Sequence, residues 1–162
     1  FIKIQVNFIE KLNYPIKELP AIFMLGNKDK KEIETLFPNY SYLTDPVGIK
    51  VYDIKEILIE KVRAILTRRG IKARDFVDVF LITKKDKLDL NDFKKQIIGK
   101  INDMLRFEKY DQNIKNKEAQ LNYDLILGEE EALMLTPIDK GFPNFLKEFN
   151  VFLKEIIKEL KL

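Results

Sequence analysis

The sequence predicts an α+β fold in which the end of a small β-sheet is followed by a mainly helical bundle. Up to about residue 52, short apolar runs are separated by turn residues, which is typical of strands. From residue 53 onward, apolar residues recur at spacings of three and four, which indicates amphipathic helices. Strands first and helices afterwards favour α+β over a doubly wound sheet. We therefore expect a β-rich segment over 1–52 and a helical domain over 53–162.

Three segments of the N-terminal part are predicted strands. In "FIKIQVNF" (1–8) the apolar residues at even positions alternate with polar ones, as in a strand that is buried on one face. Apolar runs predict a second strand in "LPAIFML" (19–25) and a third in "VGIKVY" (47–52). Between them, "KEIETLFPNY" favours a short helix that ends before Pro38, because the residue preceding a proline disfavours helical backbone.

The rest of the chain predicts helices. Asp53 and Glu56 have the spacing of a helix N-terminus, and Gly70 is suited to end the helix that follows. The segment "ARDFVDVFLITKKD" favours a second helix, although its β-branched and aromatic residues would also suit a strand. A third helix should cover about 91–107. The terminal "PNFLKEFNVFLKEIIKELKL" carries a core-facing apolar stripe, and "QNIKNKEAQ" (112–120) is expected to be a polar loop.

Composition excludes several kinds of chemistry. The 162 residues contain no cysteine and no histidine, which excludes disulfides, thiolate chemistry, Ser-His-Asp triads and histidine-ligated zinc. Any metal would need oxygen ligands, which favour magnesium, manganese or calcium. A net charge of +3 is too small for the whole molecule to hold nucleic acid, so such contacts would need a local patch. Without a membrane-length apolar run or a signal peptide, we expect a cytoplasmic protein with no membrane partner.

Arginine is concentrated in one segment. Lysine outnumbers arginine 24 to 5, yet four of the five arginines fall within residues 53–80: Arg63, Arg68, Arg69 and Arg74. Unlike lysine, arginine can bind a carboxylate or phosphate through two parallel hydrogen bonds. The clustering therefore indicates oriented anion contacts in this segment, unless it is an accident of a small count.

A lysine and two acids in the same segment are placed to meet. On a helical wheel Lys61 falls inside the apolar arc, between the directions of Ile57 and Ile65. An inward cation must reach water or meet an anion. Asp75 and Asp78, three residues apart on the next helix, share a face and could supply that anion. The group would be either a structural salt bridge or a site where Lys61 holds a triphosphate while an acid orients it or accepts a proton.

These residues also carry a resemblance to a known family. "YDIKEILIEKVRAILTRRGIKARDFVDVFLI" resembles the second conserved block of AbiEii-like nucleotidyltransferases, which are toxins of abortive-infection and toxin–antitoxin pairs in the DNA polymerase β-like superfamily. That block combines a hydrophobic strand, a helix with Glu-Lys-hydrophobic-Arg-Ala, an Arg-containing turn and Arg-Asp-x-x-Asp. The matching residues here are Glu60, Lys61, Arg63, Ala64, Arg68, Arg74, Asp75 and Asp78.

The resemblance implies transfer of a nucleoside monophosphate from an NTP, with Mg²⁺, to an acceptor such as tRNA or protein. It makes residues 1–52 the C-terminal part of a nucleotidyltransferase core. Lys61 would contact the triphosphate, and Asp75 would be the catalytic or orienting acid. It also implies a cognate antitoxin protein as a possible partner. Supporting residues would be Asp78 and Glu60, and phosphates of the nucleotide or acceptor would be bound by Arg63, Arg68, Arg69 and Arg74.

One part of the family pattern is missing. The family binds its metal with a Gly-Gly or Gly-Ser turn followed by Asp-x-Asp, and neither motif occurs in this sequence. Because the chain begins at Phe1, inside a strand-like pattern, we expect the Mg²⁺ ligands to lie upstream and the 162 residues alone not to turn over NTP. A degenerate relative is the alternative. The competing interpretation is a non-catalytic helical module that binds a protein partner or RNA, with Lys61 and Asp75 as a structural bridge.

Overall fold

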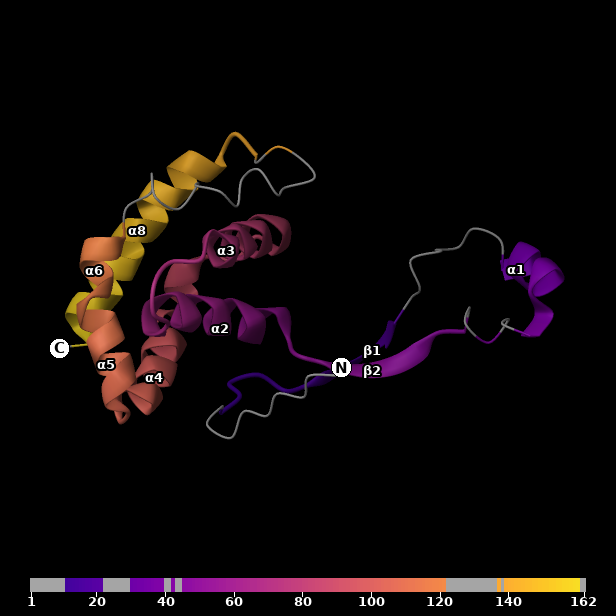
Figure 1. Ribbon diagram of the computed structural model, residues 1–162, viewed down its shortest axis with the longest axis horizontal. Coiled ribbons are helices and arrows are strands. Elements are labelled where there is room, and N and C mark those ends of the chain that lie inside the picture. Colours follow the sequence, from indigo (N-terminus) through magenta and orange to yellow (C-terminus); the bar gives the residue numbers. More distant parts are fainter. Residues whose placement is uncertain are drawn as a thin grey trace. The chain divides into compact units, whose positions relative to one another are not determined.

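The computed structural model describes residues 11–21, 30–39, 42, 45–121, 137 and 139–160. It confirms the predicted α+β class, because a two-stranded antiparallel sheet is followed by a helical region (Figure 1). The described residues form two compact units. One is Tyr14–Asp53, and the other joins the residues up to Asn13 with those from Ile54 onward. The strand predicted over 1–8 lies outside the described residues.

The smaller unit contains β1 (Lys17–Ala21), α1 (Lys30–Leu36) and β2 (Val47–Val51). The two strands are antiparallel, with Leu19 opposite Ile49. Both predicted strand segments are therefore confirmed in part, although β1 begins earlier than expected and the segment after it lies outside the described residues. Helix α1 ends before the proline, as predicted. Leu19 and Ile49 remain 49% and 44% exposed, so this ribbon presents an apolar cross-strand pair to its surroundings.

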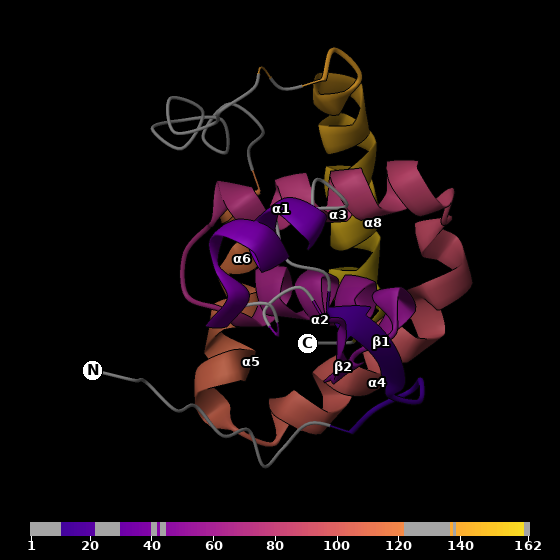
Figure 2. The same ribbon diagram turned by 90° about the vertical axis from the view of Figure 1, so that its right-hand side faces the viewer.

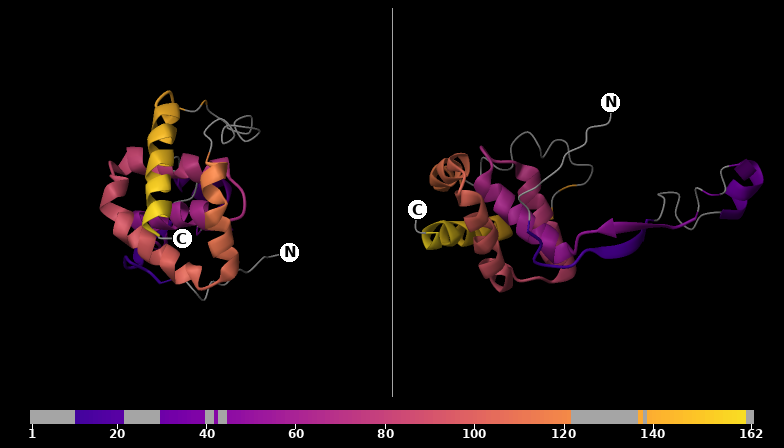
Figure 3. Two further views of the ribbon diagram at one scale, coloured as in Figure 1. Left: turned by 90° about the vertical axis from the view of Figure 1, so that its left-hand side faces the viewer. Right: turned by 90° about the horizontal axis from the view of Figure 1, so that it is seen from below.

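The helical unit is built around α2, which packs against α3, α4 and α5 (Figures 1 and 2). Helix α8 crosses α3, as the left view of Figure 3 shows. The elements of this unit are α2 (Ile54–Thr67), α3 (Ala73–Asp86), the 3₁₀-helix η2 (Leu90–Phe93), α4 (Lys94–Leu105), α5 (Glu108–Lys115), α6 (Lys117–Gln120) and α8 (Phe142–Glu159).

The core of this unit lies between α2, α3, α4 and α8. Phe76 of α3 and Phe149 of α8 are fully buried or nearly so, and their rings meet edge to face with centroids 5.6 Å apart. The apolar stripe predicted for the terminal helix is thus confirmed as a packing surface. Other fully buried residues are Leu58, Ile59, Val62 and Leu66 on α2, Ile97 and Ile101 on α4, and Leu146, Leu153 and Ile156 on α8.

Two local predictions change, and two others are confirmed. The prediction of a polar loop over 112–120 is wrong, because α5 and α6 cover most of it. This otherwise polar segment buries Ile114 and Lys117 completely. The third predicted helix is shorter and begins as the 3₁₀-helix η2. For "ARDFVDVFLITKKD" the helical alternative is correct. Helix α2 ends shortly before Gly70, whose φ of 74° suits the predicted turn.

Candidate functional site

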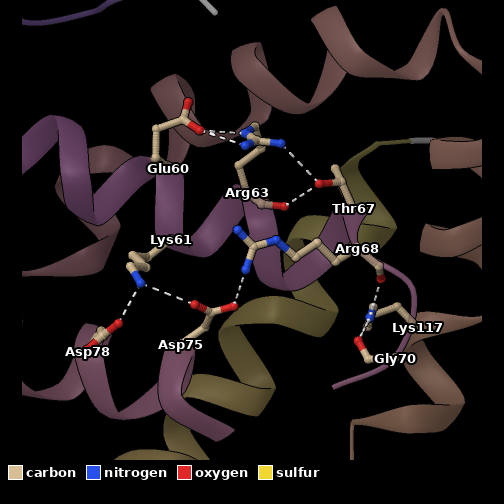
Figure 4. A network of polar contacts seen from close by, with 9 residues as sticks. All are labelled: Glu60, Lys61, Arg63, Thr67, Arg68, Gly70, Asp75, Asp78 and Lys117. Carbon is tan, nitrogen blue, oxygen red and sulfur yellow. Dashed lines mark hydrogen bonds and ion pairs between the residues drawn. The ribbon is translucent and has the colours of Figure 1, made fainter. Parts of the chain in front are cut away.

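The structure brings Lys61 of α2 together with Asp75 and Asp78 of α3 (Figure 4). The Lys61 ammonium nitrogen lies 3.2 Å from Asp75 Oδ1 and 2.5 Å from Asp78 Oδ2. The Asp75 side chain is buried at 2% exposure, whereas those of Lys61 and Asp78 are 31% and 41% exposed. The ammonium group thus sits at the boundary between core and solvent. The helical positions of Lys61 and of the two acids had indicated that these side chains could meet.

Arg68 completes the group around Asp75. It lies just beyond the last residue of α2, and its Nη1 is 2.7 Å from Asp75 Oδ2, the oxygen that Lys61 does not contact. Asp75, in the first turn of α3, therefore has one cation on each carboxylate oxygen. Arg68 itself is 45% exposed. We call Lys61, Arg68, Asp75 and Asp78 the Lys61–Asp75 cluster.

The charge state of Lys61 follows from these neighbours. Partial burial opposes the charged form, but the hydrogen bonds that Lys61 donates to Asp78 and Asp75 outweigh it and raise its pKa above the usual value of 10.5. Lys61 is therefore a cation throughout the neutral range. A half-exposed cation of this kind can exchange a carboxylate partner for a phosphate oxygen, because both are anionic acceptors at hydrogen-bond distance.

Side chains from α5 and α6 hold the turn between α2 and α3. Lys117 Nζ donates to the carbonyl oxygens of Arg68 at 2.8 Å and Gly70 at 2.6 Å, while Asn113 donates to that of Thr67 at 2.8 Å (Figure 4 shows the Lys117 contacts). These carbonyls lie at and just beyond the end of α2, where intrahelical partners run out. Lys117 is fully buried, and that burial lowers its pKa to about 8. Sequence reasoning missed Lys117, because it fell in the predicted loop.

A second polar network lies on the other side of α2. Arg63 pairs with Glu60 at 2.7 Å and also donates to Thr67. Glu60 accepts from Lys100 of α4 at 2.5 Å, and Lys100 also contacts the fully buried Glu56. Despite burial, the bonds from Arg63 and Lys100 lower the pKa of Glu60. Likewise, the bonds to Glu56 and Glu60 outweigh desolvation and raise the pKa of Lys100.

This second network separates two predicted site residues from the rest. Glu60 and Arg63 project away from the Lys61–Asp75 cluster (Figure 4). Sequence reasoning missed the role of Lys100, although a signal existed. Lys100 lies three residues after Ile97 and directly before Ile101, on the buried face of α4.

The two remaining predicted arginines are exposed. Arg74 lies in the first turn of α3. Arg69 lies in the α2–α3 turn and, among the residues that the structure describes, has no hydrogen bond or ion pair. It lines a hollow shared with α5 and α6. Four residues with predicted phosphate-binding or supporting roles lie outside the Lys61–Asp75 cluster, namely Glu60, Arg63, Arg69 and Arg74. They do not converge on one point, and those roles remain predictions.

Comparison with known families decides the classification. A family model described as nucleotidyl transferase AbiEii toxin, type IV toxin–antitoxin system, matches residues 1–157. The chain belongs to the AbiEii family. The AbiEii resemblance inferred from about thirty residues is confirmed over nearly the whole chain. No match was found among curated proteins or among solved structures.

AbiEii membership supports a nucleotidyltransferase-type function and a toxin–antitoxin setting with an antitoxin counterpart. Within the described parts of the chain, no three Asp, Glu, His or Cys side chains come close enough to hold a metal ion. Over the same residues, every helix is too short or too polar to cross a bilayer.

Proposed function

We propose that this chain supplies the triphosphate-binding and proton-accepting part of an AbiEii nucleotidyltransferase, which transfers a nucleoside monophosphate from an NTP to an acceptor. The Lys61–Asp75 cluster carries the proposal. Its location supports the role, because two charged side chains from consecutive helices meet at a place that is open to solvent on the Lys61 side.

The single observation behind the proposal is that Asp75 has two cationic partners. A buried carboxylate left without a counter-ion is costly. When Lys61 turns to the oxygens of a triphosphate, Arg68 still neutralises Asp75, so the exchange leaves no uncompensated buried charge. Asp78, the other partner of Lys61, is 41% exposed and can be solvated by water after the exchange. The cluster is therefore arranged to release Lys61 to a ligand.

The proposed chemistry uses both members of the central pair. A hydroxyl of the acceptor attacks the α-phosphorus of the NTP, the bond between that phosphorus and the bridging oxygen breaks, and pyrophosphate leaves. The hydroxyl proton passes to the carboxylate of Asp75, as in general base catalysis. Lys61 binds the triphosphate oxygens and offsets the charge that develops on the leaving group.

We further propose that the reaction uses Mg²⁺ held by ligands outside these 162 residues. Among the described residues no group of three acids could hold a metal ion, and both acids of the cluster are paired with cations. When bound, Mg²⁺ would supply positive charge that stabilises the triphosphate during transfer. An RNA such as tRNA is the acceptor that the arginine-rich segment favours, with a protein as the second possibility.

The test incubates the full-length protein with radiolabelled NTP, Mg²⁺ and total tRNA. Lys61→Ala and Asp75→Asn should each lower labelling about a hundredfold or more, the size expected for loss of a general base or a charge-stabilising group. Lys95→Ala is the matched control, because Lys95 is an exposed lysine on α4 outside the cluster. It should label like the wild type.

Thermal unfolding of the same variants separates catalysis from architecture. The proposal requires that Lys61→Ala and Asp75→Asn remain folded at the assay temperature while labelling is lost. If both variants instead unfold, and Lys61→Arg restores the fold without restoring labelling, the pair is a structural bridge. Labelling that survives in either folded variant would also overturn the assignment.

A further inference from the structure

A polar hollow lies beside the cluster, between the α2–α3 turn and the helices α5 and α6. The turn contributes Arg69 and Gly70. From α5, α6 and the residues between and beside them come Lys109, Gln112, Asn113, Asn116, Ala119 and Gln120. We call this hollow the α5–α6 groove. Its volume is about 610 Å³.

The lining chemistry of the groove favours an anionic, hydrogen-bonding ligand. Its lining contains two cations and four carboxamides and no acid, although Glu108 of α5 accepts a hydrogen bond from the lining residue Gln112 at 3.0 Å. Arg69 has no polar partner among the described residues, in contrast to Arg63 and Arg68, which are paired with acids. Beneath the turn lies the buried ammonium group of Lys117, whose bonds go to backbone carbonyls. Arginine is well suited to phosphate, and carboxamides can both donate to and accept from bases and sugars.

One end of the groove adjoins a group of aromatic and cationic side chains. Lys109, which lines the groove, lies over the ring of Tyr110 with its nitrogen 4.7 Å from the centroid. The guanidinium carbon of Arg106 lies 5.1 Å from the centroid of the Phe107 ring. The rings of Phe107 and Tyr110 meet edge to face, with their centroids 6.1 Å apart. Phe107 is 38% exposed. Partly exposed rings next to cations are the combination that single-stranded nucleic acid uses, with bases on the rings and phosphates on the cations.

The groove adjoins the turn that carries part of the Lys61–Asp75 cluster, because Arg69 and Gly70 of that turn line it. Arg69 directly follows Arg68, which contacts Asp75. An RNA strand that contacts Arg69 is therefore bound next to the residue that pairs with Asp75, the proposed proton acceptor.

We propose that the α5–α6 groove binds a single-stranded segment of an RNA acceptor, with Arg69 and Lys109 on its phosphates and Tyr110 stacked against a base. This inference rests on the proposed function, because it makes the groove the acceptor side of the same site. The groove holds the strand, and the Lys61–Asp75 cluster receives the nucleotide.

The test measures binding of a fluorescently labelled, mixed-sequence single-stranded RNA to the 162-residue chain by anisotropy. Arg69→Glu/Lys109→Glu should weaken binding at least thirtyfold, because two phosphate contacts become repulsive. Lys95→Glu, an equal charge change per site outside the groove, should change the Kd less than threefold. In Arg69→Ala/Lys109→Ala the slope of log K against log salt should become shallower by about 1.4, the value for two lost phosphate contacts on a single strand. Tyr110→Ala should weaken binding about tenfold.

Each alternative result has a defined meaning. If the wild-type chain does not bind the RNA, or if Lys95→Glu weakens binding as much as Arg69→Glu/Lys109→Glu does, the groove assignment is overturned. If NTP alone displaces the RNA and loses its own binding in Arg69→Glu/Lys109→Glu, the groove is a nucleotide site and the assignment is also overturned. RNA binding that depends on Arg69 and Lys109, in a protein that never labels tRNA, supports the groove as an RNA site and refutes transfer of the nucleotide to tRNA.

Discussion

Lys117 allows the energetics of the α2–α3 turn to be tested quantitatively. Burial lowers its pKa from 10.5 to about 8, and its two hydrogen bonds go to carbonyls that a neutral amine can still serve. Between these two pH values the unfolded chain binds more protons than the folded one, so the free energy of unfolding rises with pH. The full gain is about 3 kcal/mol, of which about 2.5 kcal/mol falls between pH 7 and pH 10.

The variant Lys117→Met removes the titrating group and keeps a linear side chain. Urea unfolding of wild type and variant, followed by far-UV circular dichroism at pH 7 and pH 10, gives two free energies of unfolding at each pH. The free energy of unfolding of the wild type minus that of the variant should be about 2.5 kcal/mol larger at pH 10 than at pH 7. Other lysines and the tyrosines titrate in both proteins and cancel. Lys95→Met, made at an exposed position, should show no such shift.

The change with pH is the informative quantity, because the effect at pH 7 alone combines opposing contributions. Lys117→Met relieves the cost of a buried charge but leaves the carbonyls of Arg68 and Gly70 without their donor, at about 1–3 kcal/mol each. A wild-type-to-variant difference that stays constant within about 0.5 kcal/mol between the two pH values would refute the reasoning. It would mean that Lys117 is solvated when the protein is folded.

Three further predictions concern glycine and lysine positions in the same unit. Gly70→Ala should lower the free energy of unfolding by about 1 kcal/mol, because φ is 74° there, while its new methyl group meets no atom within 4 Å. Gly99→Ala in α4 also meets none, so it should raise stability by about 0.5–1 kcal/mol, and a Gly99→Ala variant less stable than wild type would contradict this. Lys100→Met should cost about 3 kcal/mol or more in urea unfolding, because it strips the fully buried Glu56 of its cation. The double variant Lys100→Met/Glu56→Gln should recover most of that loss; no recovery would show that Lys100 acts through packing.

Periodicity predicted the long elements of the fold well. The stripe on α8 follows from spacing, because that helix has enough apolar residues to determine a face. For α3 the predicted bounds agree with the structure, although its β-branched and aromatic residues had left a strand as the alternative. The short helices α5 and α6 could not be predicted in this way. Among the side chains of these two helices whose burial the structure describes, the buried ones are Ile114 and the cation Lys117. Tertiary contacts with the α2–α3 turn, which no local pattern encodes, keep this segment helical and place it beside the site.

The candidate site was predictable where it depends on two adjacent helices. Lys61 on the apolar face and acids three residues apart on the next helix specify a meeting, because the short turn limits how the helices can be placed. Contacts from distant segments were not predictable. Lys117 bonds to turn residues that lie 47 and 49 positions away in sequence, and Lys100 pairs with the distant Glu60. The sequence of segment 53–80 contains no pattern that predicts either contact.

The arginines of residues 53–80 do not all serve one anion site; two of them bind acids of the protein itself. Arg63 is committed to Glu60 within α2, and Arg68 neutralises one oxygen of Asp75. Both bonds hold acids that lie near or inside the core, where the fixed fork of arginine is better suited than the ammonium of lysine. Arg69 alone among these three is without a polar partner among the described residues, and it faces the α5–α6 groove. If arginine had been enriched only to bind phosphate, Arg63→Lys and Arg68→Lys would leave stability unchanged and affect ligands alone. The observed contacts predict a different result. Arg68→Lys should weaken the contact with Asp75 and lower the stability of the fold. Arg69→Lys should weaken RNA binding and leave the thermal unfolding temperature unchanged.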